Sequence, residues 1–312
     1  MLLLMRLELA RDAAGSKLPA RESGSKLPHS KTVAKMEGIM KLGLINSAWL
    51  GTSIGTAEGI HKTKEIGFDA IDIFNDPLDI DIKERRLIKD TCREVALPVI
   101  SHCCSALGIA DFNPAVQRFH VSRCKAYLDF VYETEARNLV LVLGEYIWQQ
   151  EVIAPKAQWQ FAVDNVRTLG DHAASLGVEV AIELEPFKLS IVNSLDKMDR
   201  FLKDVDHPAV RANLDISHFA LVNTPPEAVP KLRGRIAHVH FSDCDGKVHG
   251  DLPPGRGVVN FTPYLQQLKN LGYEGTISIE LEYSPQPDKI GEWVTEAYRE
   301  TDRLMQNLGI RN

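Results

Sequence analysis

Eight short apolar runs rich in Val, Ile and Leu alternate with longer segments of helical periodicity along most of this chain. Nearly continuous apolar runs are typical of strands that are covered on both faces, as in parallel sheets. Parallel neighbours need a long crossover between them, usually a helix. The runs lie at residues 41–47, 69–74, 97–102, 138–143, 178–184, 210–215, 235–241 and 276–282.

The segments between these runs predict helices at 82–95, 114–135, 155–176, 194–203, 262–271 and 291–307. Pro155 suits a first helical turn and Gly177 suits the residue just past the end. Eight strand-then-helix units match the ~250 residues of a (β/α)8 TIM barrel, the predicted fold. A doubly wound open sheet is the alternative, but Gly51 and Gly55 lack the glycine spacing of a dinucleotide-binding loop.

Residues 1–35 differ from the rest of the chain. They repeat GSKLP at 15–19 and 24–28 and carry a net charge of +4, which leaves −10 on the remainder. We expect a disordered leader, or a segment added by expression or by a misassigned start, before a single catalytic domain at 36–312. The acidic domain argues against nucleic acid as a substrate.

Five cysteines form an odd set without a secretory signal, which favours reduced thiols and a cytoplasmic protein. No apolar run is long enough to cross a membrane, so we expect no membrane partner. Cys103 and Cys104 adjoin His102, but no second cluster stands at zinc-site spacing.

Polar side chains occur where the last four predicted strands end. In a TIM barrel the active site lies at these carboxyl ends. Buried carboxylates without partners are costly, so a cluster of them implies a cation or reciprocal pairing. Three carboxylates and one imidazole suit Mn, Mg or Co. The strand-end residues are Glu183, Glu185, Asp215, His238, His240, Glu280 and Glu282.

Residues at i and i+2 leave a strand on the same side. The pattern alone therefore cannot choose between the members of three pairs. These pairs are Glu183 and Glu185, His238 and His240, and Glu280 and Glu282.

The motifs LGVEVAIELEP, NLDISH, IAHVHFSD, PPGRGVVNF and YEGTISIELE lie in order along the chain. Residues 41–282 with these motifs resemble the xylose isomerase-like superfamily of sugar epimerases and isomerases, which is related to inosose dehydratases and an apurinic endonuclease. The resemblance implies Glu183, Asp215, His240 and Glu280 as ligands of one divalent metal, with manganese first and magnesium or cobalt as alternatives.

The same resemblance implies a sugar isomerase or epimerase that acts on a keto sugar or related polyol through an enediolate. Glu183 and Glu280 would exchange protons on opposite faces of the substrate, and His218 would stabilise the oxyanion. The chain departs from ketose 3-epimerases at two positions, so the resemblance does not define the substrate pocket. Gly246 and Leu189 stand where an arginine and an acidic residue are usual.

A sugar lyase working by β-elimination, like an inosose dehydratase or a C-glycoside deglycosidase subunit, is therefore the alternative. A non-enzymatic sugar- or metal-binding barrel also remains open. The endonuclease chemistry is disfavoured because early strands offer too few histidines and the barrel is acidic.

Three further residues are candidates for substrate binding: His102, Trp49 and Lys247. A histidine at a strand end contacts substrate or satisfies a structural bond, and an aromatic at the rim stacks on a sugar or packs in the core. The expected partner is a small sugar, and the exposed helices are compatible with a homo-oligomer or a partner subunit.

Overall fold

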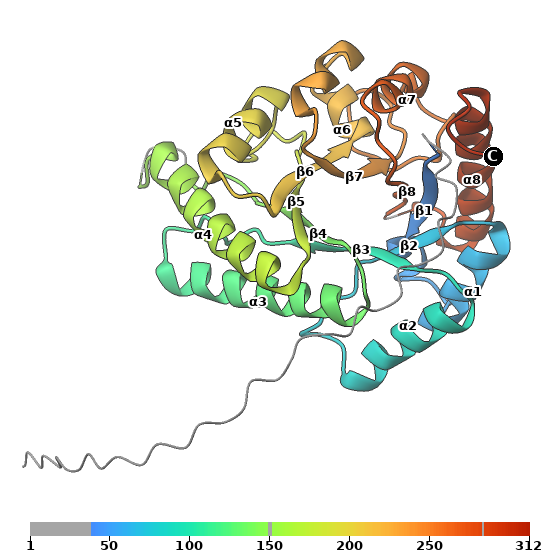
Figure 1. Cartoon of the computed structure of the whole chain (residues 1–312), viewed down its shortest axis with the longest axis horizontal. Coiled ribbons are helices and arrows are strands. Elements are labelled where there is room, and N and C mark those ends of the chain that lie inside the picture. Colours follow the sequence, from blue (N-terminus) through green and yellow to red (C-terminus); the bar gives the residue numbers. More distant parts are fainter. Residues whose placement is uncertain (1–38, 149–151, 283) are drawn as a thin grey trace, which may run out of the picture. The chain divides into compact units, whose positions relative to one another are not determined.

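The structure, a computed structural model, describes residues 39–148, 152–282 and 284–312. The predicted leader at 1–35 lies outside the described residues. Eight parallel strands close into a barrel in chain order, with helices around it (Figure 1). The prediction of a (β/α)8 barrel is confirmed. The strands are β1 (Lys41–Ile45), β2 (Ala70–Ile73), β3 (Val99–Ser105), β4 (Asn138–Val142), β5 (Glu179–Ile182), β6 (Val210–Asp215), β7 (Ile236–Phe241) and β8 (Thr276–Ile279).

The α-helices and three short 3-10 helices fill the connections between the strands. The α-helices are α1 (Thr56–Ile66), α2 (Ile82–Glu94), α3 (Pro114–Glu133), α4 (Pro155–Leu176), α5 (Leu195–Val205), α6 (Ile216–Leu221), α7 (Phe261–Asn270) and α8 (Ile290–Asn307). The 3-10 helices are η1 (Asn46–Trp49), η2 (Pro226–Leu232) and η3 (Pro287–Lys289).

Local sequence explains several helix ends. Asp81 and Asn113 precede α2 and α3, and each side chain accepts a hydrogen bond from the first turn. Pro155 occupies the first turn of α4, and Gly177 takes the left-handed conformation just past its end. Helix α4 therefore begins and ends at the predicted residues.

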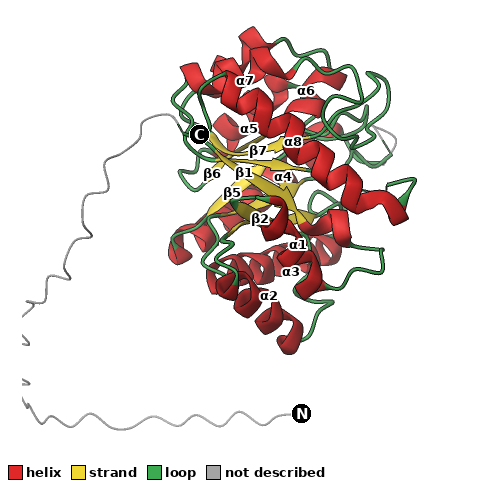
Figure 2. Cartoon of the chain, turned by 90° about the vertical axis from the view of Figure 1, so that its right-hand side faces the viewer, coloured by secondary structure: helices red, strands yellow, loops and turns green. Residues whose placement is uncertain are grey.

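Pairing of β1 with β8 closes the barrel, with Leu44 opposite Ile279. Figure 2 shows the strands at the centre and the helices outside them. A large apolar core includes residues from strands and helices, whereas a small second cluster includes Ile45, Cys103 and Val140. Because all strands are parallel, their carboxyl ends meet at one end of the barrel.

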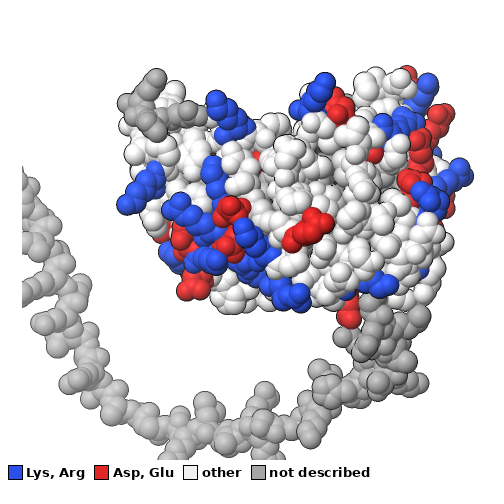
Figure 3. All heavy atoms as spheres, turned by 90° about the horizontal axis from the view of Figure 1, so that it is seen from above, with Lys and Arg blue, Asp and Glu red and all other residues white. Residues whose placement is uncertain are grey.

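The surface charges are mixed. On the face drawn in Figure 3, Lys and Arg side chains lie beside Asp and Glu side chains. On α5, Asp199 contacts both Lys203 and Arg235. Among the described residues, no helix is both long and apolar enough to span a bilayer.

Candidate active site

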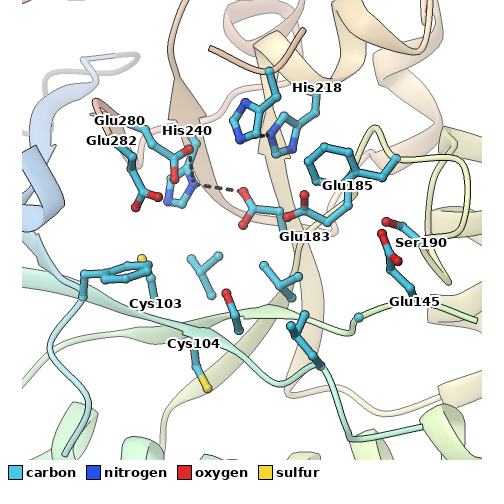
Figure 4. A pocket seen from close by; sticks show the side chains of 18 of the residues that line it. Cys103, Cys104, Glu145, Glu183, Glu185, Ser190, His218, His240, Glu280 and Glu282 are labelled. Atoms are coloured by element: carbon cyan, nitrogen blue, oxygen red, sulfur yellow. Dashed lines mark hydrogen bonds and ion pairs between the residues drawn. The ribbon is translucent and has the colours of Figure 1, made fainter. Parts of the chain in front are cut away.

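A cavity of about 710 Å³ opens at the carboxyl ends of the strands. Figure 4 shows the acidic and histidine side chains along one side and Cys103 and Cys104 on the opposite side. The lining residues are Phe74, Cys103, Cys104, Ser105, Leu107, Gly108, Asp111, Val140, Val142, Gly144, Glu145, Ile147, Glu183, Glu185, Phe187, Ser190, His218, His240, His249, Glu280 and Glu282.

The four predicted metal ligands converge at this cavity. Glu183 follows β5, Asp215 ends β6, His240 lies in β7 and Glu280 follows β8. One ligand atom from each of the four lies within 4.8 Å of the others. Neighbouring strands of a closed barrel bring together residues that are far apart in sequence, so this convergence follows from the fold.

His240 lies between two of the carboxylates. Its Nδ1 is 3.0 Å from Glu183 Oε1 and 3.3 Å from Glu280 Oε2 (Figure 4). Within the described residues, Asp215 Oδ2 and Nε2 of His240 are buried without a hydrogen-bond partner. Buried polar atoms of this kind are costly unless a ligand satisfies them. The donor set of three oxygens and one nitrogen therefore fits a divalent cation.

The two glutamates have opposite pKa shifts. Burial raises the pKa of Glu183, but the facing His240 outweighs it and lowers the pKa below its ordinary value. Burial also raises the pKa of Glu280, and there the net shift is well above the ordinary value, with Asp251 adding to it. Burial lowers the pKa of His240, yet Glu183 and Glu280 raise it well above the usual range. Glu183 thus favours the charged form and Glu280 the protonated form.

Asp215 and His218 form a compact unit at the end of β6. Asp215 Oδ1 accepts hydrogen bonds from the backbone N–H of His218 at 2.8 Å and from the hydroxyl of Ser217 at 2.9 Å. The carboxylate thereby caps α6, and its other oxygen, Oδ2, is buried without a hydrogen-bond partner. His218 Nδ1 lies 2.7 Å from the carbonyl oxygen of Leu184, which fixes the ring at the cavity.

A histidine from the β7–α7 loop joins this unit and was not singled out from the sequence. His249 Nε2 lies 3.3 Å from His218 Nε2, and its Nδ1 is 3.4 Å from Asp251 Oδ1. Asp251 is buried and also accepts a hydrogen bond from Ser242 at 3.1 Å. The loop is fixed by Asp243, which accepts backbone hydrogen bonds from Gly255, Gly257 and Val259. His249 and Asp251 lie in a loop without a periodic pattern, so the sequence alone gives no signal for this contact.

In each i, i+2 pair that the sequence left open, the two side chains leave the chain on the same side but lie at different depths in the barrel. His238 bonds to the buried Asp72, whereas His240 reaches the cavity. Residues two apart along a strand are separated by roughly 6.5 Å. Glu185 and Glu282 also line the cavity, beyond the cluster formed by Glu183 and Glu280.

The structure does not bring the three predicted substrate-binding residues to this cavity. His102 is fully buried against Phe130, and its Nε2 is 2.8 Å from the hydroxyl of Thr134. Trp49 is buried, and its indole N–H donates to Thr63 at 3.0 Å. Lys247 is exposed in the β7–α7 loop.

The sequence profile described as Xylose isomerase-like TIM barrel matches residues 60–302 of the chain. Among curated proteins, D-psicose 3-epimerase of Ruminiclostridium cellulolyticum is 25% identical over 229 residues, covering 71% of this chain and 76% of the relative. Inosose dehydratase of Geobacillus thermodenitrificans is 24% identical over 285 residues, covering 80% and 92%.

Solved structures share the fold. The IOLI protein, whose crystal structure holds a zinc atom, superposes with a TM-score of 0.72 at 19% identity, covering 86% of this chain and 99% of that one. Likeness at this identity concerns the barrel, so the chemistry of this chain has to be argued from its own residues.

Proposed function

Because the chain belongs to the xylose isomerase-like TIM barrel family, we propose that it is a divalent-metal-dependent sugar isomerase or epimerase. The observation that carries this proposal is the cluster of Glu183, Asp215, His240 and Glu280 at the cavity. Relatives such as D-psicose 3-epimerase and inosose dehydratase are enzymes that act on sugars or polyols. The substrate would be a keto sugar or a related polyol.

The cation would supply Lewis acidity to the carbonyl and the adjacent hydroxyl of the sugar, and manganese is the first choice, with magnesium or cobalt as alternatives. Glu183, Asp215, His240 and Glu280 would hold it.

The proton transfers are assigned to the two glutamates. Glu183 would remove the proton next to the carbonyl, which gives an enediolate, and Glu280 would return a proton to the opposite face. His218, held by Leu184, stabilises the developing oxyanion.

The first experiment is metal analysis of the purified chain and four variants, Glu183→Gln, Asp215→Asn, His240→Ala and Glu280→Gln. We expect about one metal per parent chain and loss or weakening of binding in each variant. Glu145→Gln is the matched control, because Glu145 lines the cavity outside the ligand cluster. Parent protein without metal, or variants with the parent's metal content, would contradict the proposal.

The second measurement is exchange of sugar C–H protons in deuterated water, followed by product mass. Epimerisation conserves mass, whereas β-elimination releases water or an aglycone. The elimination alternative is supported by His249, which lines the cavity beside His218 and could protonate a leaving oxygen. A cytoplasmic location and a homo-oligomer or partner subunit remain predictions.

A further inference from the structure

The interior of the barrel below the cavity contains a cluster of polar residues. Each of the six residues lies two positions before a residue that lines the cavity or belongs to the predicted ligand cluster. Residues two apart on a strand face the same side, so all six side chains point into the barrel. This interior polar cluster consists of Asp72 of β2, Ser101 of β3, Asn138 of β4, Asn213 of β6, His238 of β7 and Ser278 of β8.

Strand pairing brings these side chains together. Asp72 is opposite Ser101, and Ser101 is opposite Asn138, across β2, β3 and β4. Asn213 is opposite His238 across β6 and β7. The hydrogen bond of 2.8 Å between Asp72 Oδ2 and His238 Nε2 joins the two groups across the barrel. The residues therefore form one cluster, and all of its side chains are fully buried.

Most polar atoms of the interior polar cluster have no hydrogen-bond partner in the protein. Among the described residues, eight such atoms lie here, one of them at the cavity end. Burial without a partner costs free energy for each atom, so a set of this size needs a ligand that pairs with several atoms at once. The atoms are Asp72 Oδ1, Ser101 Oγ, Asn138 Oδ1 and Nδ2, Asn213 Oδ1, His238 Nδ1, Ser278 Oγ and, at the cavity end, His240 Nε2.

Short side chains leave room for such a ligand. Bulky branched residues ordinarily fill the interior of a TIM barrel. Here Ser101, Ala181 and Ser278 occupy interior positions of β3, β5 and β8. On β1, a Cβ at Gly43 would lie 2.6 Å from Ser278 Oγ, so even this short side chain needs a glycine opposite it. The interior is therefore lined by small polar groups and suits a ligand of very few atoms.

The unpaired atoms include both hydrogen-bond acceptors and donors. Asn213 Nδ2 donates to Glu183 Oε1 at 2.6 Å, which leaves Asn213 Oδ1 as an acceptor. In the neutral ring of His238, Nε2 donates to Asp72, so Nδ1 is also an acceptor. Asn138 presents one acceptor and one donor. A cation would be repelled by the donor of Asn138, whereas water donates and accepts. The chemistry of the cluster is that of a water site.

The cluster ends at the proposed metal ligand His240. Nδ1 of this ring faces Glu183 and Glu280, so it is the nitrogen directed at the proposed cation (Figure 4). Nε2 is buried and lies 3.9 Å from Asp72 Oδ2, which is too long for a direct hydrogen bond. The thiol of Cys103 adjoins the ring, but sulfur is a weak acceptor. A metal-bound imidazole carries a proton on its second nitrogen and needs an acceptor for it.

We infer that the interior polar cluster binds a chain of ordered water molecules and that one of them accepts the Nε2 proton of His240. A buried water typically makes about three hydrogen bonds, so the unpaired atoms call for about two waters or more. Asn213 joins the same chain to Glu183. The hydration stands without a metal, whereas its role in holding His240 rests on the proposed function.

The first test counts long-lived waters in the metal-free full chain by oxygen-17 magnetic relaxation dispersion in EDTA. Asn138→Leu removes two of the unpaired atoms with little change in volume and should lower the count by about one or more. Leu139→Met is the matched control, because Leu139 faces the helices and the swap conserves volume. It should leave the count unchanged. An equal count in the parent and Asn138→Leu overturns the inference.

A crystal structure of the parent loaded with magnesium tests the same inference without a variant. We expect electron density for waters within hydrogen-bond distance of Asn138, Asp72 and His240 Nε2. A cation in this density, or no density at these atoms, overturns the inference.

Thermal denaturation adds a sign. If the cluster is dry, Asn138→Leu removes two costly unpaired atoms and should raise the Tm. If water fills it, the substitution displaces water from its other partners and should lower the Tm relative to Leu139→Met. A raised Tm therefore contradicts the inference.

Calorimetric titration with manganese separates the hydration from its role at His240. We expect affinity to fall about tenfold in Asn138→Leu and to stay at the parent value in Leu139→Met. Parent affinity in a variant that has lost the water at His240 contradicts the positioning role. A parent that holds the waters but binds no metal contradicts the proposed function and leaves the hydration standing.

Discussion

Asp72 and His238 are joined by a hydrogen bond of 2.8 Å between Oδ2 and Nε2, across the closed barrel from β2 to β7. Both side chains are fully buried. Asp72 Oδ2 also lies 3.9 Å from Nε2 of His240. The distance of 3.9 Å is too long for a hydrogen bond. Asp72 therefore acts on the proposed ligand His240 through its charge and through His238, whose ring packs edge-on against that of His240 at 5.2 Å.

We expect Asp72→Asn to reduce the free energy of unfolding of the metal-free protein by about 1–3 kcal/mol, because a buried ionic hydrogen bond is lost. We also expect manganese affinity to fall about tenfold or more. Urea denaturation and calorimetric titration measure the two effects. Asp79→Asn, at an exposed position, is the control. Unaltered manganese affinity would mean that His240 is oriented without Asp72.

Metal binding should release protons. Although burial lowers the pKa of His240, the two adjacent glutamates raise it well above the ordinary value in the metal-free protein. A metal ligand must be a neutral imidazole, so binding competes with the proton and affinity should rise between about pH 6 and 8. Titration with manganese in PIPES and Tris at one pH should give enthalpies that differ by the buffer ionisation term. Equal enthalpies would argue against proton release.

The free energy of unfolding of the metal-free protein should decrease as the pH rises to alkaline values. Burial lowers the pKa of His218, but Asp215, Glu185 and Glu183 raise it to about 9. A histidine with a raised folded-state pKa stabilises fully below its unfolded pKa of about 6.5 and loses that contribution as the pH rises towards about 9. The loss should amount to up to about 3 kcal/mol.

Urea denaturation in EDTA at pH 6, 7, 8 and 9 tests this dependence. His218→Gln should flatten it, since the substituted side chain does not titrate. If the free energy of unfolding changes equally with pH in the parent and the variant, the pH dependence arises from groups other than His218.

Two glycines with similar backbone angles should respond differently to alanine. Gly144 and Gly177 have φ of 79° and 72°. A Cβ on Gly144 would lie 2.5 Å from the carbonyl oxygen of Leu107, whereas none of the described atoms lies within 4 Å at Gly177. Gly177→Ala should cost about 1 kcal/mol of backbone strain. Gly144→Ala should cost about 1–3 kcal/mol more and weaken ligand binding, because the β3–α3 and β4–α4 loops must separate. Thermal and urea denaturation compare them.

Substitution of Trp49 tests whether its side chain stabilises the hydrophobic core or contacts a ligand in the cavity. Its ring is buried, and a Cβ on Gly59 would lie 2.7 Å from it. We expect Trp49→Ala to reduce the free energy of unfolding by about 3–5 kcal/mol. Affinity of the folded variant for a sugar probe should stay near that of the parent. A selective loss of sugar affinity with parent-like stability would support the prediction that Trp49 contacts substrate.

Much of the fold could be predicted because its signals are local. Runs of Val, Ile and Leu mark all eight strands, and Pro155 with Gly177 marks both ends of α4. The largest discrepancies at strand ends concern β8, which was expected to reach residue 282 and ends at Ile279, and β3, which was expected to end at residue 102 and continues to Ser105. Pairing of Cys103, Cys104 and Ser105 with β4 extends it, and a single run of residues does not reveal such pairing.

The site was predictable only where the fold dictates it. Parallel strands of one barrel must bring the acids and histidines at their carboxyl ends together. The choice of Glu183, His240 and Glu280 over the neighbours two residues away came from the family resemblance. The Asp72–His238 bond depends on register across strands 166 residues apart. His249 reaches the cavity because Asp243 holds the β7–α7 loop, and loop conformation of this kind has no periodic signal in the sequence.

The two halves of the chain contribute different parts of the cavity lining. The proposed metal ligands come from the ends of β5 to β8, whereas the first half of the barrel contributes apolar lining residues from β4 and from the segments after β2, β3 and β4. These residues are Phe74, Leu107, Val140, Val142 and Ile147. Exchange of the first half between related barrels should therefore retune which ligand is accepted and leave the reacting end intact. Substitutions in the first half of the chain can therefore change which ligand binds, while the second half keeps the proposed metal site.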